Sequence, residues 1–156
     1  MNIRFATEAD LPRVNELRRQ VSDLHAAGKP EMFREGFGED LRQHLYTMFA
    51  QEAHQVLVAE TEQGIVGFAC LKFVDRPETP YRRAERYLDV DEFGVDESCR
   101  RQGVGRKLFG AIRELAQERG LKRIELNMWE FNEDALKFYE AVGFTTFRRY
   151  MEYTFD

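Results

Sequence analysis

The sequence lacks an excess of positive charge and has no long apolar run. Its 23 Lys and Arg residues are outnumbered by 28 Asp and Glu residues, which gives a formal net charge of -5. Because general nucleic-acid binding needs a basic surface, this balance argues against a nucleic-acid partner. No apolar stretch approaches the roughly 18 residues of a membrane span, and the N-terminal MNIRFATEAD turns polar at once. We expect a cytoplasmic protein with no membrane partner.

Cysteine is also scarce, because the chain has only Cys70 and Cys99. They form no Cys-x-x-Cys pair, and the three histidines lack the spacing of metal ligands, so neither a disulfide framework nor a metal site is predicted. The 156 residues are 43% hydrophobic and 33% charged. This length and composition are typical of one globular domain, which we expect to span residues 1–156.

Hydrophobic periodicity predicts an α/β domain. Period-two runs predict strands, and stripes at three- and four-residue spacing predict helices. Thr7 and Asp10 form a capping-box-like helix start. Three strands in succession before the third helix favour a mixed sheet over a purely parallel one. The predicted strands cover 2–5, 55–61, 65–74, 85–96, 122–129 and, as a strand or hairpin, 144–155; the predicted helices cover about 7–27, 38–51, 103–118 and 132–143.

The most informative stretch is CRRQGVGRKL, which starts at Cys99 and leads into a predicted helix. Glycines let a backbone approach a ligand closely, and a helix N-terminus favours an anion. Leu108 stands where a dinucleotide fingerprint needs its third glycine, and the spacing of a phosphate-binding P-loop is absent. Taken alone, the stretch fits a small-anion site or a solvated basic turn. Its cations are Arg100, Arg101, Arg106 and Lys107, and its glycines are Gly103 and Gly105.

Two motifs together resemble the Gcn5-related N-acetyltransferase (GNAT) superfamily. Residues 100–105 match R/Q-x-x-G-x-G/A, the pattern of that family's acetyl-CoA pyrophosphate loop. Residues 132–144 match N-x-x-A-x-x-F-Y-x-x-x-G-F, with Asn132, Ala135, Phe138 and Tyr139 in place. The element order also agrees, so the resemblance covers the whole chain and is strongest over 85–145. It implies a mixed, largely antiparallel sheet with a splayed parallel strand pair and about four flanking helices.

The resemblance implies acetyl-CoA as the cosubstrate and assigns residues to it. The pantetheine arm would pair with the backbone of the strand at Phe93, Gly94 and Val95. The pyrophosphate would lie on the backbone N–H groups of the turn, beside its arginines. Asn132 would contact the cofactor arm or simply cap its helix. The residues implied are Phe93, Gly94, Val95, Arg100, Arg101, Gln102, Gly103, Val104, Gly105, Arg106, Asn132, Ala135 and Phe138.

The resemblance also implies direct acetyl transfer to a primary amine of a small molecule or peptide. Tyr139 would be the general acid that protonates the departing CoA thiolate, since a phenol is protonated at neutral pH. Asp89, Asp91 and Glu92 are candidate bases for the amine. Strand alternation puts Asp91 on the face of Phe93 and Glu92 on the other, unless a bulge shifts the parity.

The acceptor side and the oligomeric state are less defined by the sequence. In the family, the loop after the first helix lies over the acceptor, which makes His25, Glu31 and Phe33 candidate substrate contacts. The closing segment 144–155 is a candidate for pairing between subunits, so a homodimer is expected. Two alternatives to an enzyme stay open, namely a non-catalytic acyl-CoA-binding or sensing module and a structural interaction domain. A phenol at position 139 argues against the first, and clustered cations at a glycine turn argue against the second.

Overall fold

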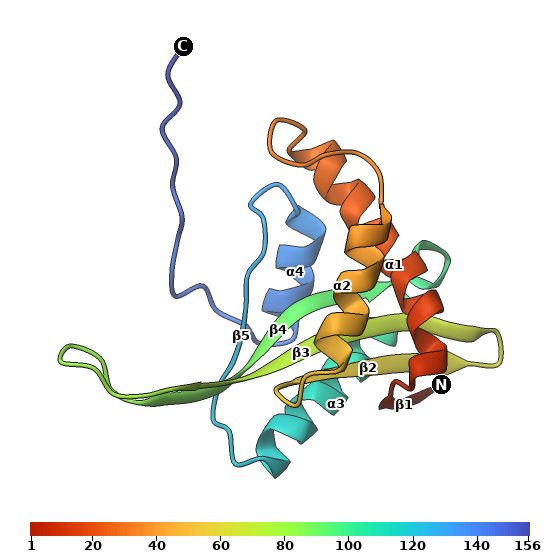
Figure 1. Ribbon diagram of the computed structural model, residues 1–156, viewed down its shortest axis with the longest axis horizontal. Coiled ribbons are helices and arrows are strands. Elements are labelled where there is room, and N and C mark those ends of the chain that lie inside the picture. The colour runs from red at the N-terminus through yellow and green to blue at the C-terminus, as the bar shows by residue number, and fades with distance from the viewer.

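The computed structural model describes residues 1–156 and contains one five-stranded sheet in the order β1-β2-β3-β4-β5 (Figure 1). The first four strands pair antiparallel, and β4 pairs parallel with β5. The mixed sheet expected from the sequence is therefore confirmed. The strands are β1 Asn2–Phe5, β2 His54–Thr61, β3 Gly64–Arg76, β4 Glu85–Val95 and β5 Ile124–Leu126; the helices are α1 Leu11–Gly28, α2 Glu39–Phe49, α3 Val104–Glu118 and α4 Glu133–Ala141, with 3-10 turns η1 Glu8–Asp10 and η2 Glu97–Cys99.

Helices cover both faces of the sheet, with α1 and α2 on one face and α3 on the other (Figure 1). Alternation along β3 feeds both layers, because Phe68 packs with the α1 side and Leu71 with the α3 side. Each fully buried side chain of this size stabilises the fold by roughly 2 kcal/mol. The first core contains Leu11, Val14, Leu17, Leu45, Met48, Val56, Val58, Ile65, Phe68 and Cys70; the second contains Leu57, Ala69, Leu71, Leu88, Val90, Leu108, Ile112, Leu115, Ala116 and Leu121.

The parallel pair separates soon after it forms. Only Leu88–Val90 of β4 pair with β5, so the rest of β4 has β3 on one side and no strand on the other. A bulge lies at this point, because Val90 pairs with Leu71 and Glu92 pairs with Cys70, which leaves Asp91 without a partner. The expected splayed pair is confirmed, and it opens where β4 is bulged.

The bulge corrects the predicted parity of the β4 side chains. Val90 and Phe93 both pack on the α3 side, whereas Glu92 reaches Arg18 of α1. Unbroken alternation would have placed Asp91 with Phe93, but the extra residue removes Asp91 from that register. The carboxylate of Glu92 thus lies on the α1 side of the sheet, opposite the ring of Phe93.

Three predicted element boundaries also need correction. The capping pair is real, since Thr7 donates its N–H to Asp10 Oδ2 at 2.7 Å, but it caps η1, which precedes α1. β5 covers only 124–126 of the predicted 122–129. Residues 144–155 form no strand or hairpin, because a strand needs a pairing partner and this segment has none within the chain. No helix has both the length and the apolar character needed to cross a membrane.

Candidate functional site

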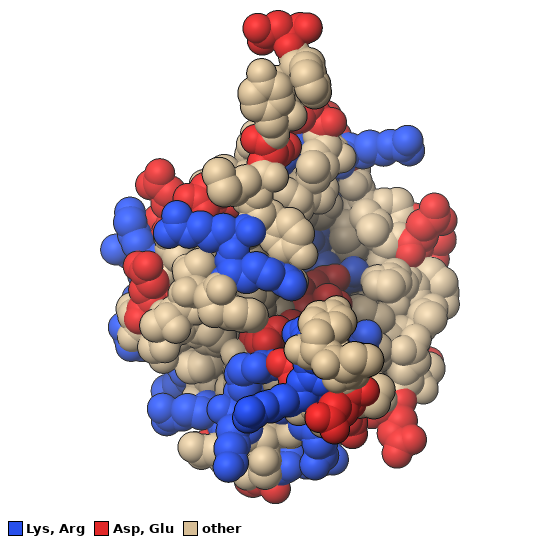
Figure 2. Space-filling model, turned by 90° about the vertical axis from the view of Figure 1, so that its left-hand side faces the viewer, with Lys and Arg blue, Asp and Glu red and all other residues tan.

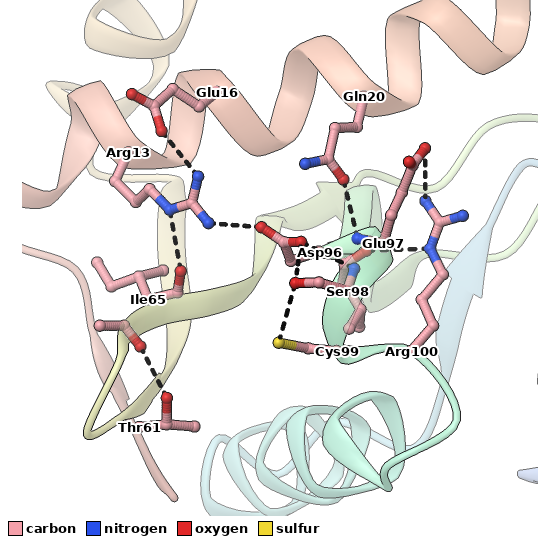
Figure 3. A network of polar contacts seen from close by, with 12 residues as sticks. Arg13, Glu16, Gln20, Thr61, Ile65, Asp96, Glu97, Ser98, Cys99 and Arg100 are labelled. Carbon is pink, nitrogen blue, oxygen red and sulfur yellow. Dashed lines mark hydrogen bonds and ion pairs between the residues drawn. The ribbon is translucent and has the colours of Figure 1, made fainter.

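A polar network fastens the end of β4 to α1 (Figure 3). Arg13 donates to Asp96 Oδ2 at 2.5 Å and to the Ile65 carbonyl at 3.1 Å. Asp96 in turn accepts from the hydroxyl of Ser98 at 2.7 Å and from its N–H at 3.0 Å. The hydrogen bonds from Ser98 lower the pKa of Asp96 below its usual value, and the hydrogen bond from Arg13 lowers it further. The network holds η2 in place, and with it the start of the turn at residues 100–106.

The turn at residues 100–106 presents free backbone donors. Arg101 and Gly103 adopt left-handed conformations, with φ of 61° and 82°, and such kinks between right-handed residues turn successive N–H groups toward one side. The N–H groups of residues 101–106 have no acceptor within the protein. They lie at the N-terminus of α3, where the helix dipole contributes about half a positive charge. This geometry is that of an anion site.

The side chains of the turn divide into two groups. Arg100 donates from Nε to the Val95 carbonyl at 3.2 Å, and Gln102 donates to the Ser98 carbonyl at 3.0 Å, so both support the backbone. Arg101 and Arg106 are exposed, and neither has an ion-pair partner. Val104 is buried beneath the turn and anchors it to the sheet. The turn therefore carries unpaired cations above a rigid base.

The free edge of β4 lies beside this turn. Asp96 donates its N–H to the Val66 carbonyl at 2.8 Å, and hydrogen-bonded pairs alternate along an antiparallel ladder. Gly94 and Glu92 therefore bond to β3, whereas the N–H groups of Phe93 and Val95 point away from it. Because β5 has already separated, these groups face an unpaired edge. Gly94 itself is required by packing, since a Cβ there would lie 2.6 Å from Phe68.

Tyr139 on α4 lies near Phe93 of the free β4 edge. Its ring lies 6.2 Å from that of Phe93, and Phe138 stacks on Phe93 at 5.6 Å. A Cβ on Gly105 would lie 3.1 Å from the Phe138 ring, so a larger residue at this position would have to displace that ring by a few tenths of an ångström. The Tyr139 hydroxyl has no hydrogen bond within the protein, and burial raises its pKa to about 12. The phenol is therefore fully protonated at neutral pH.

Asn132 caps α4, since its Oδ1 accepts from the N–H of Ala135 at 3.2 Å. The same side chain lines a surface cavity of about 440 Å³ between α4 and the end of α1. The cap is thus observed, and the cavity leaves the side chain accessible. The other residues that line the cavity are Leu24, Ala27, Gly28, Phe131, Glu133 and Asp134.

The three β4 carboxylates have different surroundings. Glu92 accepts from Arg18 Nε at 2.6 Å and Nη2 at 2.8 Å, so both of its oxygens are engaged. Asp91 is exposed and has no hydrogen-bond or ion-pair partner. Asp89 is half-buried, and its pKa is raised, first by burial and then by the charges of Asp91 and Glu125. An unpaired carboxylate therefore lies at the bulge, and a paired one lies beside it.

The proposed acceptor residues are only partly brought together. His25 lies 5.3 Å from Phe33 between ring centroids, and Phe33 lies 5.0 Å from Trp129. Phe131 is 6.2 Å from His25 and completes this aromatic cluster. Burial lowers the pKa of His25, although the charge of Glu92 opposes this. Glu31 pairs instead with Lys29, with its carboxylate 3.4 Å from the ammonium.

Sequence reasoning missed Arg18, whose side chain is only 4% exposed. It also donates to Asn15 Oδ1 at 2.9 Å and to the Leu41 carbonyl at 2.6 Å. The available signal was its position, because Arg18 falls between Val14 and Val21 on the apolar stripe of α1. A charged residue on such a stripe is rarely buried without a charged partner.

Comparison with known proteins places this geometry in a family. The sequence model of the Acetyltransferase (GNAT) family matches residues 18–144. The chain therefore belongs to the GNAT family. Among solved structures, it is similar to the tetramutant of the BH1408 protein from Bacillus halodurans, with a TM-score of 0.95, 28% identity and coverage of 99% of this chain and 100% of that one.

Two curated relatives match the chain over only part of their own length. The chain is 33% identical to "Probable N-acetyltransferase camello" of Xenopus laevis over 87 residues, which are 56% of this chain and 36% of that protein. It is 30% identical to "Uncharacterized N-acetyltransferase YycN" of Bacillus subtilis (strain 168) over 83 residues, 53% and 49% of the two chains. The matches thus span less than half of either relative. An aminoglycoside N-acetyltransferase, AAC(6')-Iy, solved with CoA, shares the fold at a TM-score of 0.76 and 18% identity, over 98% of this chain and 93% of that one.

Proposed function

We propose that the protein is an N-acetyltransferase that moves the acetyl group of acetyl-CoA to a primary amine of a small molecule or peptide. The observation that carries this proposal is the row of free N–H groups at residues 101–106 beside the unpaired edge of β4. A pyrophosphate needs such donors, and an amide-containing arm needs such an edge. Family membership supports the same reading.

Acetyl-CoA is held by two parts of the chain in this proposal. The backbone of Gln102, Gly103, Val104, Gly105 and Arg106 binds the pyrophosphate, with Arg100 and Arg101 beside it. The backbone of Phe93, Gly94 and Val95 receives the pantetheine amides along the free edge. Asn132, Ala135 and Phe138 line the α4 side of the arm. The exposed, unpaired charges of Arg101 and Arg106 fit a dianionic group better than a neutral one.

The reaction is direct transfer. The neutral amine nitrogen attacks the thioester carbonyl, a C–N bond forms, and the C–S bond breaks. The outward N–H of Val95 stabilises the developing oxyanion. Tyr139 donates its phenolic proton to the departing thiolate, for which its position beside Phe93 and its protonated state are suited. The acetylated amine and CoA are the products, and the phenolate regains a proton from water.

The amine must also lose a proton, and Asp91 is the favoured base. Its carboxylate is exposed at the bulge and unpaired, whereas both oxygens of Glu92 are engaged by Arg18. Glu92 then acts mainly by holding β4 to α1 while its charge faces His25. Asp89 adds negative charge beside Asp91, which keeps a cationic amine close before it is deprotonated.

The acceptor enters on the side of α1 and its following loop. His25 and Phe33 are offered as substrate contacts because they form one face of the aromatic cluster. Glu31 is a contact for a positively charged group of the substrate. Its carboxylate would give up its ion pair with Lys29 and bind the substrate cation instead. Two free cysteines fit the cytoplasm, in which we also place the protein as a homodimer.

The test is amine-dependent release of CoA thiol from acetyl-CoA across a panel of primary amines. Wild type should turn over at least one amine, and Tyr139→Phe should lower kcat by about 100-fold with little change in KM for acetyl-CoA. Tyr81→Phe, at an aromatic that is 87% exposed on the β3–β4 hairpin, is the matched control. Binding of acetyl-CoA with no turnover of any amine would favour the non-catalytic acyl-CoA-binding module instead.

A further inference from the structure

A second cavity, of about 490 Å³, lies on the side of the sheet that α3 covers. It is bounded by α3 from Phe109 onward, by the start of β5 and by the end of α4. None of its residues belongs to the turn at 100–106 or to the β4 edge, so it is separate from the proposed acetyl-CoA site. Its volume is that of a small-molecule site.

Three cationic side chains and no carboxylate line this cavity. Arg113 and Lys122 are exposed, and neither takes part in an ion pair. Arg123 is already engaged, by Glu85 at 3.1 Å and by Glu125 at 3.0 Å. Figure 2 shows Lys and Arg side chains gathered on the lower part of the molecule, the level at which α3 ends and β5 begins in Figure 1. Because the chain has a formal net charge of -5, this is a local reversal of charge, and it favours an anionic ligand.

The walls between these cations are apolar. The rings of Phe109 and Phe144 lie 5.1 Å apart between centroids, and both side chains are half-buried. Ile124 and Val142 are half-buried as well, so four apolar side chains leave surface open to solvent at one place. Covering such surface favours binding. A small inorganic anion would leave these walls uncovered, and a neutral hydrocarbon would leave the two free cations without a partner.

We propose that this cavity binds a small amphipathic anion, with an acidic head group such as a carboxylate on an apolar chain or ring. The head group lies between Arg113 and Lys122, because a carboxylate has acceptors for both a guanidinium fork and an ammonium. The apolar body covers Phe109 and Phe144. The proposal does not depend on acetyl transfer, since no residue of the cavity is assigned to that reaction.

The end of α4 connects this cavity to Tyr139. Phe144 donates its N–H to the Tyr139 carbonyl at 2.9 Å, and its ring lies 5.6 Å from the ring of Tyr139. Gly143, with a φ of 106°, supplies the left-handed residue that ends the helix. A ligand that packs on Phe144 therefore restrains the last turn of α4. We expect the amides of residues 139–144 to exchange more slowly when the cavity is filled.

The experiment is calorimetric titration of octanoate into the full chain without acetyl-CoA, together with amide hydrogen exchange. Wild type should bind octanoate with a dissociation constant on the order of 0.1 mM. Acetate supplies the charge without the apolar body, and 1-octanol supplies the body without the charge. Each should therefore bind at least ~10-fold more weakly than octanoate.

Two variants test the site from different directions. Arg113→Gln/Lys122→Gln should raise the dissociation constant of octanoate at least ~10-fold, because it removes both free cations from exposed positions. Gln117→Phe should do the same, since it fills the cavity from an exposed position on α3. Arg19→Gln/Arg34→Gln is the matched control. It removes two exposed charges from α1 and the loop after it, on the other side of the sheet, and should leave binding unchanged.

Four results would overturn the proposal. Wild type could fail to bind octanoate, because its own C-terminal segment fills the cavity and protects residues 139–144 or for any other reason. The Arg113→Gln/Lys122→Gln variant, or 1-octanol in place of octanoate, could bind as well as the wild-type pair does. Saturating acetyl-CoA could compete with octanoate, which would place octanoate in the acyl-CoA site. Failure of acetyl-CoA to bind, with octanoate bound as expected, would count against the proposed function only.

Discussion

The guanidinium of Arg18 binds both carboxylate oxygens of Glu92, with N–O distances of 2.6 and 2.8 Å. This pair joins α1 to β4 immediately beside the bulge, and the ring of Phe37 covers the guanidinium at 5.5 Å. Arg18 is almost fully buried, so its charge depends on Glu92 for compensation. The pair therefore helps to hold α1, the loop that carries Phe37 and the bulge at Asp91 in place relative to one another.

Replacing Arg18 with Met should lower the free energy of unfolding by about 3 kcal/mol, because Glu92 would keep its charge without a partner. Urea unfolding measures the change. The double variant Arg18→Met/Glu92→Gln should lose less than the sum of the two single losses, by roughly 1 kcal/mol or more. Arg19→Met is the control, because Arg19 is 63% exposed and its pair with Asp23 is long, at 3.9 Å. This substitution should lower the free energy of unfolding by less than about 0.5 kcal/mol. Equal losses for the two arginines would contradict the pair's role.

Gly105 and Gly110 lie in the same helix but should respond oppositely to alanine. A Cβ at Gly105 would lie 3.1 Å from Phe138, whereas nothing lies within 4 Å of one at Gly110. Gly110→Ala should stabilise the protein by up to about 1 kcal/mol through helix propensity. Gly105→Ala should destabilise it by about 1 kcal/mol and displace α4 with Tyr139. Thermal unfolding of both variants tests this, and a gain in stability for Gly105→Ala would show that the contact is slack.

Asp96 should matter for acetyl-CoA binding although it lies before the turn. Asp96→Ala removes the hydrogen bonds from Ser98 and the pair with Arg13, so the turn loses its fixed start. We expect about a tenfold weaker affinity for acetyl-CoA, equivalent to about 1.4 kcal/mol. Glu16→Ala removes the other, exposed partner of Arg13 and should leave the affinity unchanged. The two variants would be compared by equilibrium titration, and equal affinities would refute the supporting role of Asp96.

Tyr139 should make the protein less stable at high pH. Its pKa is raised to about 12 in the folded state, against about 10 for an unfolded tyrosine. The folded state therefore favours the protonated phenol. The resulting stabilisation of the fold is on the order of 2 kcal/mol. It is fully present below about pH 10 and is lost as the pH rises toward 12. Urea unfolding from pH 9 to 11.5 should show a steeper decline for wild type than for Tyr139→Phe. Parallel declines would mean that the phenol is not buried as described.

Most of the helices and strands were predictable because local sequence patterns specify them. The apolar stripe of α1 and the paired runs of β2 and β3 are each specified by consecutive residues. The turn at residues 100–106 was predictable for the same reason, since its glycines and arginines are adjacent in sequence.

What the sequence did not reveal depends on contacts between distant segments. The bulge at Asp91 follows from pairing with β3, and the partner of Arg18 lies 74 residues away. Residues 144–155 have a strand-like composition, but no strand forms in them because pairing is not a local property. The bulge and the Arg18–Glu92 pair are the features that distinguish Asp91 from Glu92 as candidate bases.

The central claim is that the turn and the β4 edge bind acetyl-CoA, and calorimetric titration of acetyl-CoA tests it most directly. Wild type should bind with micromolar affinity, and Gly110→Ala should bind equally well. Arg100→Ala/Gly103→Glu should abolish binding, because it removes a supporting cation and places a carboxylate among the free N–H groups at Gly103, whose φ is 82°. No heat of binding for wild type with acetyl-CoA or other acyl-CoAs, or unchanged affinity in the double variant, would contradict the account.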